Sequence, residues 1–193
     1  MSSTSRKLLG ITAMTLVVIG AGLVFTLSSS AAISVPPPGT ICVKLAKMGH
    51  TFIPFGTTNG LFAPTNGSIT AQVGQQISNG FAFSVIDFKS TGTVSGLGNV
   101  AITLDSTRRP EQSTFTANTS GQDNTQRINF FINVDVNGKK YRSAGQVTLL
   151  STSVAAFPPP SGTAYALVNK VQLVDSAGKV AYELPVGQAA TIL

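Results

Sequence analysis

The chain of 193 residues has 42% hydrophobic residues and a net charge of +6 at pH 7, which suits one domain with a full core and a targeting segment. Charged residues make up only 10% of the chain, far below the usual ~25%, and the basic ones are too scattered to indicate a nucleic-acid interface. With 19 glycines, 10 prolines and polar residues that are mostly Ser, Thr, Asn and Gln, the composition is typical of extracellular β proteins and untypical of cytosolic enzymes.

The N-terminal residues predict export. Arg6 and Lys7 precede the uncharged residues 8–27, and small residues follow, so residues 1–32 have the layout of a secretory signal peptide cleaved before Ile33. The uncharged stretch is also close to the ~20 residues that span a bilayer, so a retained single transmembrane helix is the alternative. In both cases the rest of the chain would lie outside the membrane, secreted or on the cell-surface or periplasmic side.

The remainder of the chain predicts a linker and one β domain. Residues 33–39 contain three consecutive prolines and indicate an extended linker, and residues 40–193 form the domain. In this domain apolar and polar residues alternate in short segments that end at turn residues, and no segment has a helical period. We expect roughly eight to ten strands in an antiparallel β-sandwich, jelly-roll or Ig-like, preceded by the N-terminal hydrophobic helix; a closed barrel is the alternative.

The clearest element is a hairpin in residues 127–150. Apolar residues alternate with polar ones up to Asn137-Gly138, a sequence that favours a type I′ turn. Counting back from this turn predicts four facing pairs: Val136–Lys139, Asp135–Lys140, Val134–Tyr141 and Asn133–Arg142. We expect Asp135 and Lys140 to form a cross-strand ion pair on the solvent face.

No catalytic or metal-binding constellation is recognisable in the sequence. His50 is the only histidine and no G-x-S-x-G motif accompanies it, so we interpret it as a turn residue at the start of a strand. Cys42 is the only cysteine and is interpreted as a small buried hydrophobe, with an intermolecular disulfide as the alternative. The two residues alone cannot complete a zinc site. The sequence therefore predicts a non-enzymatic protein without a cofactor or a metal.

The candidate site residues are a possible interaction surface on the hairpin, formed by Phe131, Tyr141 and Arg142. Phe131 is the one apolar residue that falls on the solvent face of its strand. Either a neighbouring segment covers its ring, which is the favoured interpretation, or the ring marks a face that binds a partner.

The function predicted from these observations is that of an exported, non-enzymatic surface, envelope or extracellular-matrix protein that acts through interactions. Its partner would be a protein, a glycan or a lipid, not nucleic acid, and the membrane would be a further partner through residues 8–27 if they are not cleaved. A glycan- or lipid-binding module is one alternative. A pilin-like or other filament subunit is another, because an apolar segment starts at Ile11 after Gly10, as in a prepilin.

Overall fold

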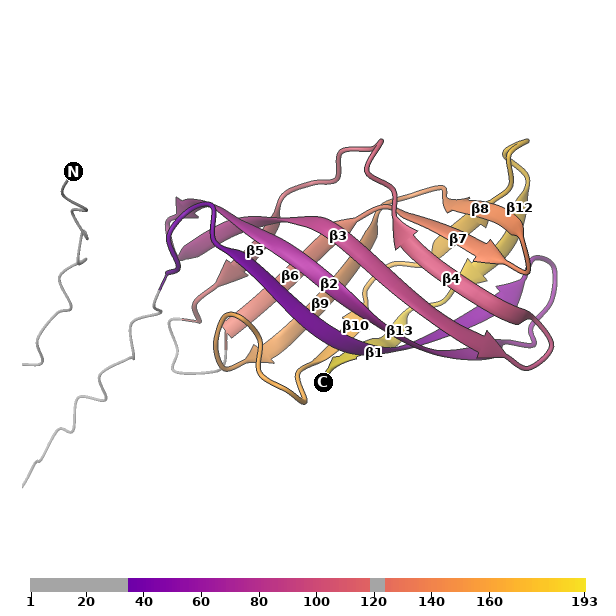
Figure 1. Ribbon diagram of the computed structural model, residues 1–193, viewed down its shortest axis with the longest axis horizontal. Helices are drawn as coiled ribbons and strands as arrows, with labels where there is room; N and C mark the ends of the chain where they lie inside the picture. The colour runs from indigo at the N-terminus through magenta and orange to yellow at the C-terminus, as the bar shows by residue number, and fades with distance from the viewer. Residues whose placement is uncertain (1–34, 119–123) are drawn as a thin grey trace, which may run out of the picture. The chain divides into compact units, whose positions relative to one another are not determined.

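A computed structural model describes residues 35–118 and 124–193, and every regular element in this part of the chain is a β-strand. All strand pairings are antiparallel (Figure 1), so the all-β, antiparallel prediction is confirmed. In chain order the strands are β1 (Ile41–Pro54), β2 (Leu61–Ile77), β3 (Gly80–Val94), β4 (Gly98–Leu104), β5 (Ser113–Thr116), β6 (Asn124–Phe130), β7 (Ile132–Val136), β8 (Lys139–Ser143), β9 (Val147–Val154), β10 (Ala164–Leu167), β11 (Val171–Val174), β12 (Val180–Leu184) and β13 (Gly187–Ile192).

The expected N-terminal hydrophobic helix, within residues 1–32, lies outside the described residues, as does the start of the linker. In the described ranges no helix is long and apolar enough to cross a membrane. Residues 35–193 form one compact unit.

The strands of this unit close on themselves as one sheet. Three strands of the barrel, β1, β2 and β3, are continuous. Each of the other five is interrupted once and therefore consists of two labelled strands: β4 with β5, β6 with β7, β8 with β9, β10 with β11, and β12 with β13. The last broken strand returns to the first, because Met48 of β1 pairs with Ala190 of β13 and Ile53 of β1 pairs with Glu183 of β12. In the described residues, three continuous and five broken strands therefore form an eight-stranded up-and-down barrel.

The predicted sandwich of two sheets, jelly-roll or Ig-like, is not confirmed, since all the strands belong to one sheet. The alternation of apolar and polar residues reports which face of a strand is buried. It does not report whether the first and last strands pair with each other, and this pairing distinguishes a closed barrel from a sandwich.

Apolar side chains fill the interior of the barrel. The even-numbered residues of β1 from Ala46 to Phe52 point inward and are at most 9% exposed, whereas Lys47 between them is exposed. Farther along the interior Phe81 stacks on Phe115 with ring centroids 5.3 Å apart, and Phe157 packs edge-on against Phe81 at 4.8 Å. An eight-stranded barrel has an interior of the size that side chains can fill.

The predicted register of the β7–β8 hairpin is confirmed at all four pairs. Asn137 and Gly138 have φ angles of 50° and 81°, as a type I′ turn requires. The expected ion pair is not among those of the described residues, which are Lys89–Asp87 and Lys170–Glu183. The Asp135 carboxylate instead accepts a hydrogen bond of 2.6 Å from the Gly138 amide, because a short acidic side chain beside a turn competes for the turn's own backbone.

Candidate functional site

A cleft of about 680 Å³ opens at one end of the barrel, and we call it the rim cleft. It lies where the end of β1 meets the tips of the β7–β8 and β11–β12 hairpins, which reach the same end of the unit in Figure 1. Three segments that are distant in the sequence therefore contribute to one site. The lining residues are Pro54, Phe55, Lys139, Lys140, Tyr141, Asp175, Lys179, Val180 and Ala181.

The rim cleft has an excess of positive charge. Lys139, Lys140 and Lys179 are exposed, and none of them takes part in an ion pair of the described residues. The one acidic residue of the lining, Asp175, directs a carboxylate oxygen to the Ala177 and Lys179 amides, each at 2.9 Å. Its carboxylate is thus used to hold the β11–β12 turn. Three lysine ammonium groups around one opening attract an anion.

Aromatic rings lead from the rim cleft into the barrel, in a series that we call the aromatic row. Tyr141 and Tyr182 meet edge to face with centroids 5.2 Å apart, Tyr182 meets Phe52 at 6.1 Å, and Phe52 meets His50 at 6.5 Å. Burial, followed by the interaction with Tyr141, raises the pKa of Tyr182. Tyr182 is therefore a neutral hydroxyl at physiological pH, and the row adds no negative charge to the cleft.

His50 lies within β1 and not at a turn, so its interpretation as a turn residue is wrong. It is 9% exposed, and its Nε2 has no hydrogen-bond partner in the described part of the chain. Burial lowers the pKa of His50 to about 4, so the imidazole is neutral at pH 7. The inward alternation of Ala46, Met48, His50 and Phe52 was the signal in the sequence that could have placed this residue in the interior.

The structure separates the three candidate residues of the hairpin. Tyr141 lines the rim cleft, and Phe131 and Arg142 do not. Phe131 is half-buried because the guanidinium of Arg108 lies 3.7 Å from its ring centroid. A neighbouring segment thus covers the ring of Phe131, in agreement with the favoured interpretation. Arg142 is exposed and faces Asn133 across the hairpin.

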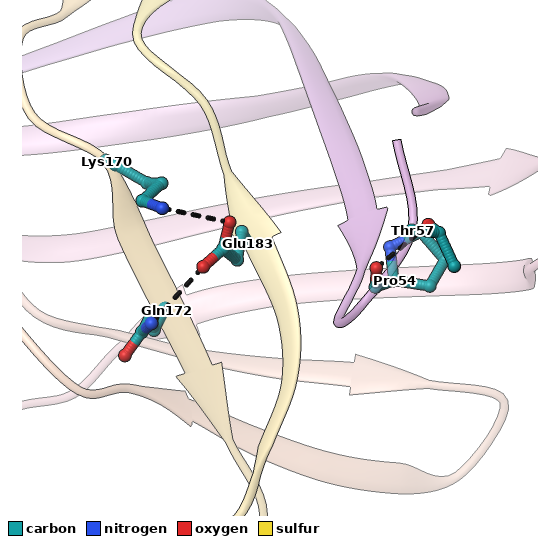
Figure 2. A network of polar contacts seen from close by, with 5 residues as sticks. All are labelled: Pro54, Thr57, Lys170, Gln172 and Glu183. Atoms are coloured by element: carbon teal, nitrogen blue, oxygen red, sulfur yellow. Dashed lines mark hydrogen bonds and ion pairs between the residues drawn. The ribbon is translucent and has the colours of Figure 1, made fainter. Parts of the chain in front are cut away.

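The surroundings of Glu183 in β12 hold it as a carboxylate. Gln172 Nε2 and Lys170 Nζ each donate to it at 3.2 Å (Figure 2), and these hydrogen bonds lower the pKa of Glu183.

A hydrogen bond closes the turn after β1: the Thr57 hydroxyl donates to the Pro54 carbonyl at 2.9 Å (Figure 2). This bond thereby fixes the wall of the rim cleft.

No protein-family model and no curated protein sequence matches the chain. A solved structure that does match is that of DynF from the dynemicin biosynthesis pathway of Micromonospora chersina. The two chains are 15% identical, with a TM-score of 0.72 over 94% of this chain and 92% of DynF. At this identity the likeness shows that the two proteins share a fold.

The comparison corrects the prediction that the protein is not an enzyme. That prediction rested on the absence of a recognisable catalytic motif from a β-rich sequence. DynF has this fold over nearly its whole length and comes from a biosynthesis pathway. A β-rich composition with this fold therefore does not indicate a purely structural role. The non-enzymatic assignment is therefore withdrawn.

Proposed function

We propose that the protein binds a small organic anion with an apolar body at the rim cleft. The observation that carries this proposal is the position of three lysines without acidic partners, among the described residues, around a cleft that also holds Phe55 and Tyr141. The lysines attract the acidic group of the ligand, and the two rings contact its apolar part. Among the functions predicted from the sequence, this is the ligand-binding alternative. An acidic lipid or an aromatic acid suits these residues better than a neutral glycan, which would leave the lysines unpaired.

The apolar body supplies most of the affinity. Burial of ~200 Å² of apolar ligand surface contributes about 5 kcal/mol at ~25 cal/mol per Å², whereas an exposed ion pair contributes about 1 kcal/mol or less. Because association also costs several kcal/mol of freedom of motion, we expect a dissociation constant in the micromolar range or above. The lysines therefore contribute mainly to the preference for anionic over neutral ligands, and the apolar contacts contribute most of the affinity.

The likeness to DynF supports a role that involves a small molecule. DynF is described as a protein of a biosynthesis pathway, and the proteins of such a pathway handle small molecules. Ligand binding in the shared fold agrees with this description. It is also the first step of any catalysis that the barrel performs.

The test compares two ligands that differ only in charge. Isothermal titration with 2-naphthoate and with the uncharged 2-naphthamide should show tighter binding of the naphthoate. The variant Lys139→Gln/Lys179→Gln should remove at least fivefold of that preference and leave the affinity for naphthamide unchanged. Lys47→Gln, on the outer face of β1, is the matched control and should behave like the parent protein. Equal binding of naphthoate by the parent protein and the double variant would contradict the proposal.

The predicted export also stands as a proposal, supported by Arg6-Lys7 and the uncharged residues 8–27. The intact mass of the chain from its natural host, measured together with its membrane partition, tests it. A soluble product that begins near Ile33 supports secretion, and a membrane-bound full-length chain supports an anchor. A product that begins at Ile11 supports the filament alternative.

A further inference from the structure

The first residues of β1 form an open sheet edge. On one side Ile41–Lys44 pair with β2. On the other side β13 pairs only with Ala46–Met48, and its last contact is the hydrogen bond of 3.0 Å from the Leu193 amide to the Leu45 carbonyl. In residues 35–118 and 124–193, no strand flanks Ile41–Lys44 on this second side.

Among the described residues, the main-chain groups that face this open side without a partner strand belong to Ile41 and Val43. The Thr40 carbonyl accepts from the Val73 amide of β2 at 2.8 Å, whereas the Leu45 carbonyl points to β13. Successive residues of a strand direct their main-chain groups to opposite sides. Ile41 and Val43 lie four and two residues before Leu45, so their N–H and C=O groups point to the same side as those of Leu45. This is the open side.

The side chains of the same edge favour contact with another strand. Ile41, Val43 and Leu45 lie on the outer face of β1 and are 58%, 61% and 61% exposed. Proteins usually protect an exposed edge with charged residues, proline or a bulge. Here the three consecutive outward positions are all apolar, and the one charge of the edge, Lys44, lies on the opposite face of the strand, so the outer face lacks this protection.

We propose that a second copy of this chain occupies the edge, with the two β1 strands antiparallel about a twofold axis at Cys42. Ile41 then forms a hydrogen-bonded pair with Val43 of the partner subunit, and the axis repeats this pair, which gives about four main-chain hydrogen bonds. Apolar side chains face apolar side chains on the outer surface, and Lys44 faces Thr40 of the partner subunit. No two lysines stand opposite each other.

The hydrogen bond of Leu193 excludes the register with its axis at Val43. An axis at Val43 would set Ile41 opposite Leu45 of the partner subunit, and the Leu45 carbonyl already accepts from the Leu193 amide. An axis at Cys42 avoids this conflict, because the facing residues are then Ile41 and Val43, whose main-chain groups are free. The edge is thus complementary to itself in the register centred on Cys42.

The register predicts a specific cross-link. The two Cys42 residues face each other in a non-hydrogen-bonded pair, where Cα atoms are ~4.5 Å apart, within the ~4.4–6.8 Å that a disulfide spans. Oxidised glutathione can form this bond: two Cys42 thiols give up two protons and two electrons, their sulfurs join, and the glutathione disulfide is reduced to two glutathiones. Burial raises the pKa of the Cys42 thiol, so the cross-link should form slowly, and association itself does not require it.

Sedimentation of the full chain in a reductant, followed by non-reducing electrophoresis after addition of oxidised glutathione, tests the proposal. We expect a dimer that glutathione cross-links, and Cys42→Ser should abolish the cross-link and keep the dimer. Val43→Pro removes a donor on the open side that β2 does not use. It should raise the dimer dissociation constant at least tenfold and leave the unfolding temperature unchanged when both chains are compared at concentrations where they are monomeric. Val43→Lys should also weaken the dimer, whereas Val186→Lys, at a position that is equally exposed at 62%, should not.

Three results would overturn the proposal. A monomeric parent chain would show that the edge stays open or that residues 1–34 cover it, and hydrogen exchange at the Ile41 and Val43 amides separates these two cases. A dimer that survives Val43→Pro would place the contact elsewhere in the chain. A dimer that oxidised glutathione does not cross-link through Cys42 would exclude the twofold axis at this residue.

Discussion

His50 meets the ring of Phe52 edge to face, with centroids 6.5 Å apart and planes inclined by 71°, inside a barrel whose mouth is lined by lysines. Phe52 is 0% exposed and His50 9% exposed, and the Nε2 of His50 has no hydrogen-bond partner in the described residues. A protonated imidazole in this position would be a buried charge without a counter-ion. The interior therefore holds His50 neutral, and the stability of the barrel depends on pH through this residue.

The free energy of unfolding should fall as the pH is lowered from about 6.5 to about 4. The pKa of His50 is lowered to about 4 in the folded chain, against ~6.5 in an unfolded one. Between these two pH values the unfolded chain binds a proton at His50 and the folded chain does not. The stabilisation is complete above pH 6.5 and is lost as the pH falls towards 4, and the full difference is about 3 kcal/mol. Urea denaturation at pH 7 and pH 5 measures the part of this difference that lies between the two pH values, about 2 kcal/mol.

His50→Leu is the control for this pH dependence. Leucine does not titrate, so the difference in unfolding free energy between pH 7 and pH 5 should shrink to what the carboxylates contribute. An unchanged pH dependence in the variant would contradict the assignment to His50.

The sequence predicted those features that depend on neighbouring residues. The Asn137-Gly138 turn determined the register of the β7–β8 hairpin, and alternation identified the strands. The closure of the barrel could not be predicted in this way, because it depends on pairs such as Met48–Ala190 that local patterns do not report. His50 was misplaced for a related reason: it was interpreted as a turn residue at the start of a strand, whereas the inward alternation of β1 runs through it to Phe52.

The candidate site was predicted only in part. Tyr141 was expected to belong to an interaction surface, and it lines the rim cleft. Lys139 and Lys140 were predicted only as members of facing pairs in the hairpin, since nothing near them in the sequence suggested a partner. The cleft exists because the β11–β12 turn brings Lys179 beside them, and this proximity depends on the closed fold.

Arg108→Ala should destabilise the barrel by about 2 kcal/mol. Arg108 stacks on Phe131 and donates to the Ser143 carbonyl at 2.5 Å and the Ala144 carbonyl at 3.0 Å. A cation–π contact contributes about 0.5–1 kcal/mol, and hydrogen bonds from a charged donor contribute somewhat more. Denaturant unfolding measures the loss. Arg109→Ala changes the exposed neighbour and should stay within about 0.5 kcal/mol of the parent protein, and equal effects of the two variants would contradict the role of Arg108.

Tyr165→Phe should cost about 1–3 kcal/mol of stability. The Tyr165 hydroxyl donates to Oε1 of Gln126 at 2.5 Å, and both residues are 2% exposed. Removal of the hydroxyl leaves a buried amide oxygen without this donor, and the desolvation cost of that oxygen is no longer offset. The double variant Tyr165→Phe/Gln126→Leu removes both partners and should recover part of the loss in the same unfolding experiment. A double variant that is less stable than Tyr165→Phe would show that the hydrogen bond is not the cause.

Gly67→Ala should be among the most destabilising single changes in the barrel. Gly67 of β2 lies opposite Ser90 of β3, and a Cβ at this position would overlap the Lys89 carbonyl oxygen and crowd the Ser90 Cα. The obstacle is backbone, which a side-chain rotation cannot relieve, so β2 and β3 would have to move apart at this point. Such overpacking costs about 1–3 kcal/mol or more. Gly145→Ala, where a Cβ meets no atom within 4 Å, should leave the unfolding temperature close to that of the parent protein. If both alanines are tolerated equally, β2 and β3 do not approach each other this closely at Gly67.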